Sequence, residues 1–193
     1  MTKLKLYLFK LSLTAILTAL AIVLNSFLSI KIGEQIKITL YGFPLIILGL
    51  FSGPLFGFIG GLTCAIVNDI IGYGISLGTI WWSIAPISWA LIPALFRKFY
   101  FKNNNIKYYK GLIIVLISAF SAFLFNNLAF FLDLKVFGYD YGDLLIMNVI
   151  FRLISLLIST ELFSILLYFI AKPLNLLYGK RVRHINNKDE SND

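Results

Sequence analysis

The sequence is poor in charge and in the residue types that build metal centres. Only 13% of its 193 residues are Asp, Glu, Lys or Arg, whereas roughly a quarter are charged in a soluble domain. It holds one cysteine, Cys64, inside an apolar run, and one histidine, His184, in a polar tail. This excludes a disulfide framework and leaves no metal-ligand spacing. We therefore expect no metal and no cofactor.

Signatures of nucleotide-driven or covalent chemistry are also missing. The sequence has no P-loop, no glycine-rich dinucleotide turn and no Ser/His/Asp set. A membrane transferase or a rhomboid-like protease would need a nucleophile or a metal set within its helices. We predict that the chain is not an enzyme and that it cannot energise transport by itself.

Long apolar runs fill most of the chain. Hydrophobic residues make up 59% of it, and the runs lack the polar faces of soluble helices. Because about 20 apolar residues cross the ~30 Å hydrocarbon core, we predict an all-α integral membrane six-helix bundle. The first run is too long for a signal-peptide core and no cleavage site follows it. The expected helices cover about 6–30, 36–51, 54–71, 80–95, 111–132 and 144–171.

The basic residues predict the orientation of this bundle. Thirteen of them fall on one side of the membrane and three on the other, which is a positive-inside signal that places the N- and C-termini in the cytoplasm. We expect a multi-pass protein of a bacterial cell membrane, with one domain at 1–180 and a disordered polar tail at 181–193. The net charge of +8 then suits lipid headgroups rather than nucleic acid. The thirteen are Lys3, Lys5, Lys10, Arg97, Lys98, Lys102, Lys107, Lys110, Lys172, Lys180, Arg181, Arg183 and Lys188.

Ionisable residues inside the apolar runs mark the expected site, because charge within a membrane is costly. A rise of ~1.5 Å per residue places Asp69 and Arg152 in the outer half of the bundle and Glu161 in the inner half. A structural Asp69–Arg152 ion pair and contact of Asp69 with lipid headgroups remain alternatives, and we assign no substrate contact to Glu161. The outer cluster predicted to bind a small polar molecule is Asn68, Asp69, Asn126, Asn127 and Arg152.

Aromatic residues lie at the same expected height. Trp81 and Trp82 suit an interfacial belt, but a flat heteroaromatic ligand would also need stacking faces there. We therefore add Trp81, Tyr41 and Phe43 to the predicted substrate-binding residues.

Small residues repeat every four positions on two of the predicted helices. Gly57, Gly61 and Ala65 form one stripe, and Ala15 and Ala19 form another. Such stripes let helices approach closely, either within the bundle or against another membrane subunit.

The sequence resembles the substrate-binding S components of energy-coupling factor (ECF) vitamin transporters over nearly its whole length. The resemblance lies in the topology, in the Ala15/Ala19 stripe, and in the stretch ITLYGFPLIILGLFSGP at 38–54 with its continuation through Asp69. The folate-type S component looks most similar, by the segments VLNSFLSI at 23–30 and FRLI at 151–154. Folate members usually carry an arginine where this chain has Asn25-Ser26, so riboflavin and pantothenate remain alternatives.

The resemblance implies a function and partners. The chain would capture a vitamin outside the cell, with Arg152 pairing a ligand carboxylate, the asparagines bonding a ring edge and an aromatic side chain stacking. The loops at 31–37 and 72–78 would cap the pocket. Ala15 and Ala19 would dock against a transmembrane coupling subunit that two cytoplasmic ATPase subunits drive. A self-sufficient carrier or channel is the alternative from another class.

Overall fold

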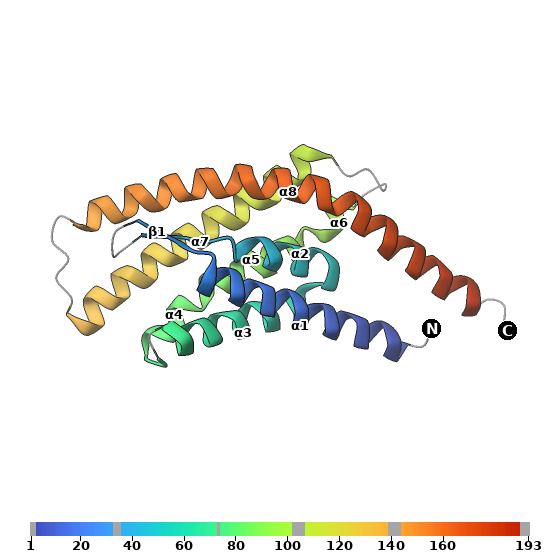
Figure 1. Ribbon diagram of the computed structural model, residues 1–193, viewed down its shortest axis with the longest axis horizontal. Coiled ribbons are helices and arrows are strands. Elements are labelled where there is room, and N and C mark those ends of the chain that lie inside the picture. The colour runs from blue at the N-terminus through green and yellow to red at the C-terminus, as the bar shows by residue number, and fades with distance from the viewer. Residues whose placement is uncertain (1–2, 33–35, 73, 102–106, 139–143, 190–193) are drawn as a thin grey trace.

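The structure is a computed structural model that describes residues 3–32, 36–72, 74–101, 107–138 and 144–189 (Figure 1). The helical architecture predicted from the sequence is confirmed. A small antiparallel hairpin is added to it, formed by β1 (Ile30–Ile32) and β2 (Ile36–Ile38). The helices are α1 (Lys3–Phe27), α2 (Gly42–Ser52), α3 (Pro54–Gly72), α4 (Gly78–Trp82), α5 (Ile84–Leu95), α6 (Arg97–Tyr100), α7 (Tyr108–Phe137) and α8 (Leu144–Asp189).

The described helices form a multi-pass membrane protein. Large apolar side chains are exposed along them, such as Phe27 at 80% and Phe169 at 68%, and exposure on this scale suits lipid rather than water. Figure 1 shows both chain ends at one end of the molecule, with α4 and the hairpin toward the other. Within the described residues, five segments are long and apolar enough to cross a membrane, namely Leu4–Phe27, Pro54–Gly72, Gly78–Leu95, Tyr108–Phe137 and Asn148–Ala171.

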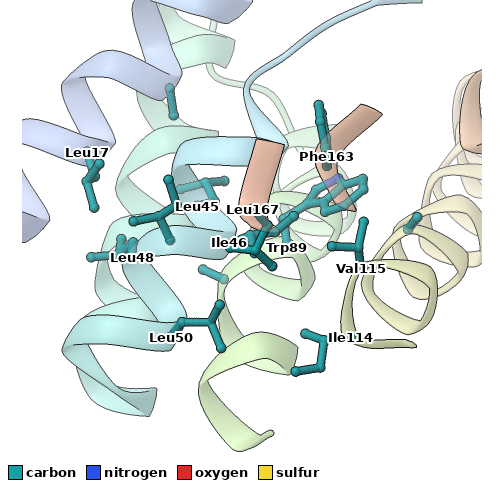
Figure 2. Close-up of a cluster of buried hydrophobic side chains, with 14 of the residues drawn as sticks. Leu17, Leu45, Ile46, Leu48, Leu50, Trp89, Ile114, Val115, Phe163 and Leu167 are labelled. Atoms are coloured by element: carbon teal, nitrogen blue, oxygen red, sulfur yellow. The ribbon is translucent and has the colours of Figure 1, made fainter. Parts of the chain in front are cut away.

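Helix α2 is short because it is an internal helix. Its 11 residues span about 16 Å at 1.5 Å per residue, roughly half the hydrocarbon thickness. Leu45, Leu48 and Leu50 are all fully buried, and α1, α3, α5 and α8 surround it. A helix that is apolar all round is expected at such a position. Figure 2 shows its leucines within a core that Leu17, Ile114 and Leu167 of neighbouring helices complete.

Glycine lets α2 and α3 pack directly on the backbone of α5. A Cβ atom on Gly49 would overlap the carbonyl oxygen of Ala90, and one on Gly61 would lie 2.8 Å from the Cα of Ile87. Real Cβ atoms do not approach so closely, so both positions require glycine. The Gly57/Gly61/Ala65 stripe therefore makes contacts within the bundle, which is one of the two roles that small-residue stripes can have.

Two predicted helix boundaries are wrong. Residues 36–38 form strand β2 and not the start of a helix; the alternating Ile-Lys-Ile pattern is typical of strands. The helix predicted at 80–95 divides at Ser83 into α4 and α5. Pro86 has no N–H to donate to the carbonyl of Trp82, four residues earlier, so an uninterrupted helix would lose that bond.

Two other helices are longer than predicted. Helix α7 extends the range expected at 111–132 by three residues at its start and five at its end, and α8 continues to Asp189. Residues 181–189 of the predicted disordered tail are thus helical, while 190–193 lie outside the described residues. The division of the chain at residue 180 stays a prediction.

Candidate functional site

A cavity of about 1250 Å³ opens between α3, α4, α7 and α8. The exit of α1 and the segment that enters α2 also line it, through Asn25, Ser26, Thr39 and Tyr41. Ligand pockets usually measure ~300–1,000 Å³, so this cavity can hold a vitamin-sized molecule together with water.

The α3 wall carries two of the predicted polar residues. Asn68 and Asp69 both line the cavity. The Asn68 side-chain N–H donates to Sγ of Cys64 at 3.3 Å, while its Oδ1 is buried and accepts nothing from the described residues. The Asp69 carboxylate accepts a hydrogen bond from Thr79 at the start of α4. An unsatisfied buried amide oxygen is unfavourable, and a turn of the Asn68 amide toward the cavity would bring this oxygen to a ligand donor.

The α8 wall is a polar stripe along one side of the helix. Asn148, Arg152, Ser155 and Ser159 all line the cavity, and they follow one another at spacings of four, three and four residues. This spacing keeps successive side chains on one helix face. The stripe ends at Phe163, which also lines the cavity, so α8 presents hydrogen-bonding groups followed by an aromatic ring.

Arg152 is held by aromatic rings and a backbone carbonyl. Its guanidinium carbon lies 5.1 Å from the ring centroid of Phe130 and 5.6 Å from that of Trp82. One Nη donates to the carbonyl oxygen of Asn126 at 2.8 Å. Among the described residues the structure has no Arg152–carboxylate ion pair, so the alternative of a structural pair with Asp69 is not what is observed. Cation–π contacts stabilise the charge and leave donors available to a ligand.

Asp133 of α7 accepts two indole N–H groups from α4. Trp81 Nε1 donates to Oδ1 at 2.7 Å, and Trp82 Nε1 donates to Oδ2 at 2.6 Å. Asp133 and Trp82 both line the cavity. The carboxylate therefore fastens α4 to α7 at the edge of the site.

An aromatic floor closes the cavity toward the core. Trp89 and Phe163 meet edge to face with ring centroids 5.5 Å apart, and both are labelled in Figure 2. Tyr41 and Phe123 add further rings to the lining. A Cβ on Gly42 would lie 2.9 Å from the Trp89 ring, so glycine there allows α2 to begin directly against the floor.

The structure brings most of the predicted site residues together, but not all of them. Asn68, Asp69, Asn126, Arg152 and Tyr41 line the cavity. The other three are not among its lining residues. The Asn127 side chain donates to the carbonyl of Phe123 in its own helix at 2.8 Å, Phe43 packs against Phe163 in the core, and Trp81 bonds Asp133.

Several lining residues were missed by sequence reasoning. Asn148, Ser155 and Ser159 could have been found from their helical spacing with Arg152, although serines rarely stand out by themselves. The loops expected to cap the pocket are placed in part. Residues 33–35 and Tyr73 lie outside the described residues, while Gly72, Gly74, Ser76 and Gly78 line the cavity.

Two further predicted features lie away from the cavity. Ala15 and Ala19 are exposed on α1, whereas Thr14, Thr18 and Ala21 on the same helix are buried against the bundle. Glu161 is also exposed, and it accepts a hydrogen bond from the hydroxyl of Tyr108 at 2.8 Å.

A helical membrane protein with a large polar and aromatic cavity is a protein built to bind a small molecule within the bilayer. The profile of the family described as "ECF-type riboflavin transporter, S component" matches residues 5–176. The chain belongs to this family. It is thus the substrate-binding subunit of an ECF-type vitamin importer rather than an enzyme, and it associates with an ECF module. A comparison with curated proteins found no match. The family match does not support the folate-specific assignment made from the sequence.

Proposed function

We propose that this chain captures riboflavin outside the cell and delivers it inward when coupled to the ECF module. The observation that carries the proposal is the charge of the cavity. Among its described lining residues Arg152 is the one cation, against two carboxylates, Asp69 and Asp133. Riboflavin is an uncharged molecule with a flat tricyclic ring and a polyhydroxyl chain. Its binding therefore adds no charge to a cavity whose described lining residues hold one cation and two carboxylates.

Folate suits the same cavity less well. Its glutamate carries two carboxylates, and like charges brought together at a binding site cost several kcal/mol. One guanidinium would have to offset both of them beside Asp69 and Asp133. The riboflavin named in the description of the family supports the same choice.

The groups along the walls match the parts of riboflavin. The aromatic floor of Trp89, Phe163 and Tyr41 offers faces and edges to a flat ring. Asn68, Asn126 and Arg152 offer hydrogen bonds to the heteroatoms of its edge. The serines and Asn148 of α8 suit the hydroxyl groups of the chain.

Ligand titration of the purified protein tests the proposal. Riboflavin fluorescence should be quenched saturably by the detergent-solubilised chain, and an excess of folate or pantothenate should not restore it. Competition by folate would return the assignment to the folate type. Vesicles that hold the chain alone should bind riboflavin without accumulating it; accumulation without the ATPase subunits would instead indicate a self-sufficient carrier.

We further propose six passes with both chain ends in the cytoplasm. The five long segments and the short α2, which reaches across only part of the bilayer, together give six, and thirteen basic residues lie in the parts of the sequence expected on the cytoplasmic side, against three on the other. The exposed Ala15/Ala19 face then lies open to the coupling subunit.

Labelling with a membrane-impermeant maleimide tests this orientation. In a background with the buried Cys64 replaced by alanine, single cysteines would replace Ser76 and Lys107, both exposed. Ser76→Cys should react in intact cells and Lys107→Cys only after permeabilisation. The reverse pattern would invert the topology.

A further inference from the structure

We propose that Asp133 is a positioning residue of the vitamin site, which orients Arg152 through the indole of Trp82. The inference rests on the proposed function and concerns the same cavity. Nothing in the sequence marked Asp133 for this role, because the helix that bears it was expected to end at Leu132.

The contacts form a continuous chain from carboxylate to cation. Oδ2 of Asp133 accepts Trp82 Nε1 at 2.6 Å, and the ring of the same indole lies 5.6 Å from the guanidinium carbon of Arg152. The carboxylate withdraws no donor from Arg152, because the indole stands between the two charges. A hydrogen bond to a carboxylate also draws the indole proton outward and enriches the ring face in electron density, which strengthens its attraction for a cation.

The second oxygen makes the arrangement rigid. Oδ1 accepts Trp81 Nε1 at 2.7 Å, so consecutive residues of α4 are tied to one carboxylate. The first turn of α4 comes close to it, since a Cβ on Gly78 would lie 3.3 Å from Oδ1. Two anchors fix both the position and the rotation of this five-residue helix, and so the plane of the Trp82 ring.

Among the described residues, the direction of the guanidinium is therefore set without an ion pair. Phe130 and Trp82 hold it through their rings, and the carbonyl of Asn126 takes one of its N–H groups. An Arg–carboxylate pair would consume the planar bidentate edge. Here one N–H group is taken by the carbonyl of Asn126, and the described residues leave the other N–H groups of the guanidinium to a neutral hydrogen-bonding ligand.

Asp133→Asn tests the proposal because asparagine keeps the shape but has one acceptor oxygen. Its amide N–H₂ would face one of the two indole N–H groups. Loss of a charged hydrogen bond with an unmatched donor should weaken riboflavin binding about tenfold, measured by fluorescence titration. Trp81→Phe removes one of the two donors, so a single acceptor suffices. In the Trp81→Phe variant, Asp133→Asn should therefore lower the affinity for riboflavin by no more than about twofold.

A double-mutant cycle separates positioning from simple bracing. If Asp133 acts on the ligand through Arg152, Asp133→Asn should lose most of its effect on affinity in an Arg152→Ala background. A brace that only holds the fold would cost the same factor in both backgrounds, and that result would overturn the inference. So would a Trp81→Phe variant that fails to reduce the effect of Asp133→Asn. A parent protein that binds no riboflavin would instead overturn the proposed function, and the inference would fall with it.

Discussion

The two halves of the bundle are packed by opposite means. Helices α2, α3 and α5 meet backbone to backbone, with Gly49 and Gly61 against α5. Helices α7 and α8 carry larger polar and aromatic side chains on their facing sides and leave a cavity of about 1250 Å³ beside them. The first half leaves no space for a methyl group at Gly49 or Gly61, while the second has space for a ligand.

This difference separates stability from binding. Close packing of small residues favours helix association in lipid, so the α2/α3/α5 half can hold the fold without help from the cavity. The α7/α8 half can then carry polar groups that would weaken a packed core. Substitutions in the α2/α3/α5 half should change the stability against unfolding, and substitutions in the α7/α8 half should change the affinity for riboflavin.

The largest effect is expected at Gly49. Gly49→Ala would place a methyl group on the Ala90 carbonyl oxygen, and overpacking of this kind costs about 3 kcal/mol or more. We expect little monodisperse protein in detergent and a large fall in melting temperature. Gly72→Ala is the matched control, because no atom lies within 4 Å of its added Cβ. If both variants had the melting temperature of the parent, the proposed difference in packing between the two halves would be wrong.

A second test compares two faces of α1. Ala19 is exposed and Ala21 is fully buried. Ala19→Leu should leave melting temperature and riboflavin affinity unchanged but reduce uptake by the assembled transporter more than about tenfold, because a bulky residue separates packed helices. Ala21→Leu should lower the stability of the isolated chain by about 1–3 kcal/mol. Normal uptake by the Ala19→Leu transporter would remove this face as the docking site.

Arg152 tests the cavity half. Arg152→Ala should weaken riboflavin binding about tenfold, the worth of one charged hydrogen bond, with little change in melting temperature. Arg152→Lys keeps the charge but lacks the planar group that lies against Trp82 and Phe130, so its affinity should lie between those of the parent and the alanine variant. Parent-like titration of Arg152→Ala would show that the guanidinium does not touch the ligand.

The smallest effect distinguishes two neighbouring asparagines. Asn126 lines the cavity, and its alanine variant should lose about threefold in affinity, as for a neutral hydrogen bond. The backbone carbonyl that Arg152 uses is retained in that variant. Asn127 bonds its own helix, so Asn127→Ala should titrate like the parent. Equal losses of affinity from both substitutions would mean that the ligand also contacts Asn127.

The sequence predicted the long helices well because lipid imposes a length on each apolar run. Helices α3 and α8 begin where expected, and α1 differs by three residues at each end. The division at Ser83 was not foreseen, although Pro86 signals it. Helix α2 was misjudged because its neighbours, and not lipid, set its length.

The site was predicted in part, for a similar reason. Depth along each helix was enough to bring Asn126 and Arg152 to one level, and they do meet. Asp133 lies just beyond the helix predicted at 111–132, but α7 continues to Phe137 and ends at Gly138 in a left-handed conformation with φ of 68°, a common helix stop. That glycine was readable in the sequence. The pairing of Asp133 with two indoles was not, because it depends on where α4 lies relative to α7.

The shortness of α2 has a consequence for how the protein enters the membrane during synthesis. A segment of about 16 Å gains too little from lipid to partition there alone. We therefore expect α2 to enter as a hairpin with α3, joined by Gly53 with its positive φ of 94°. The surface of α5 against which α2 packs emerges later from the ribosome. Helix α2 can therefore become buried only after α5 has entered the membrane.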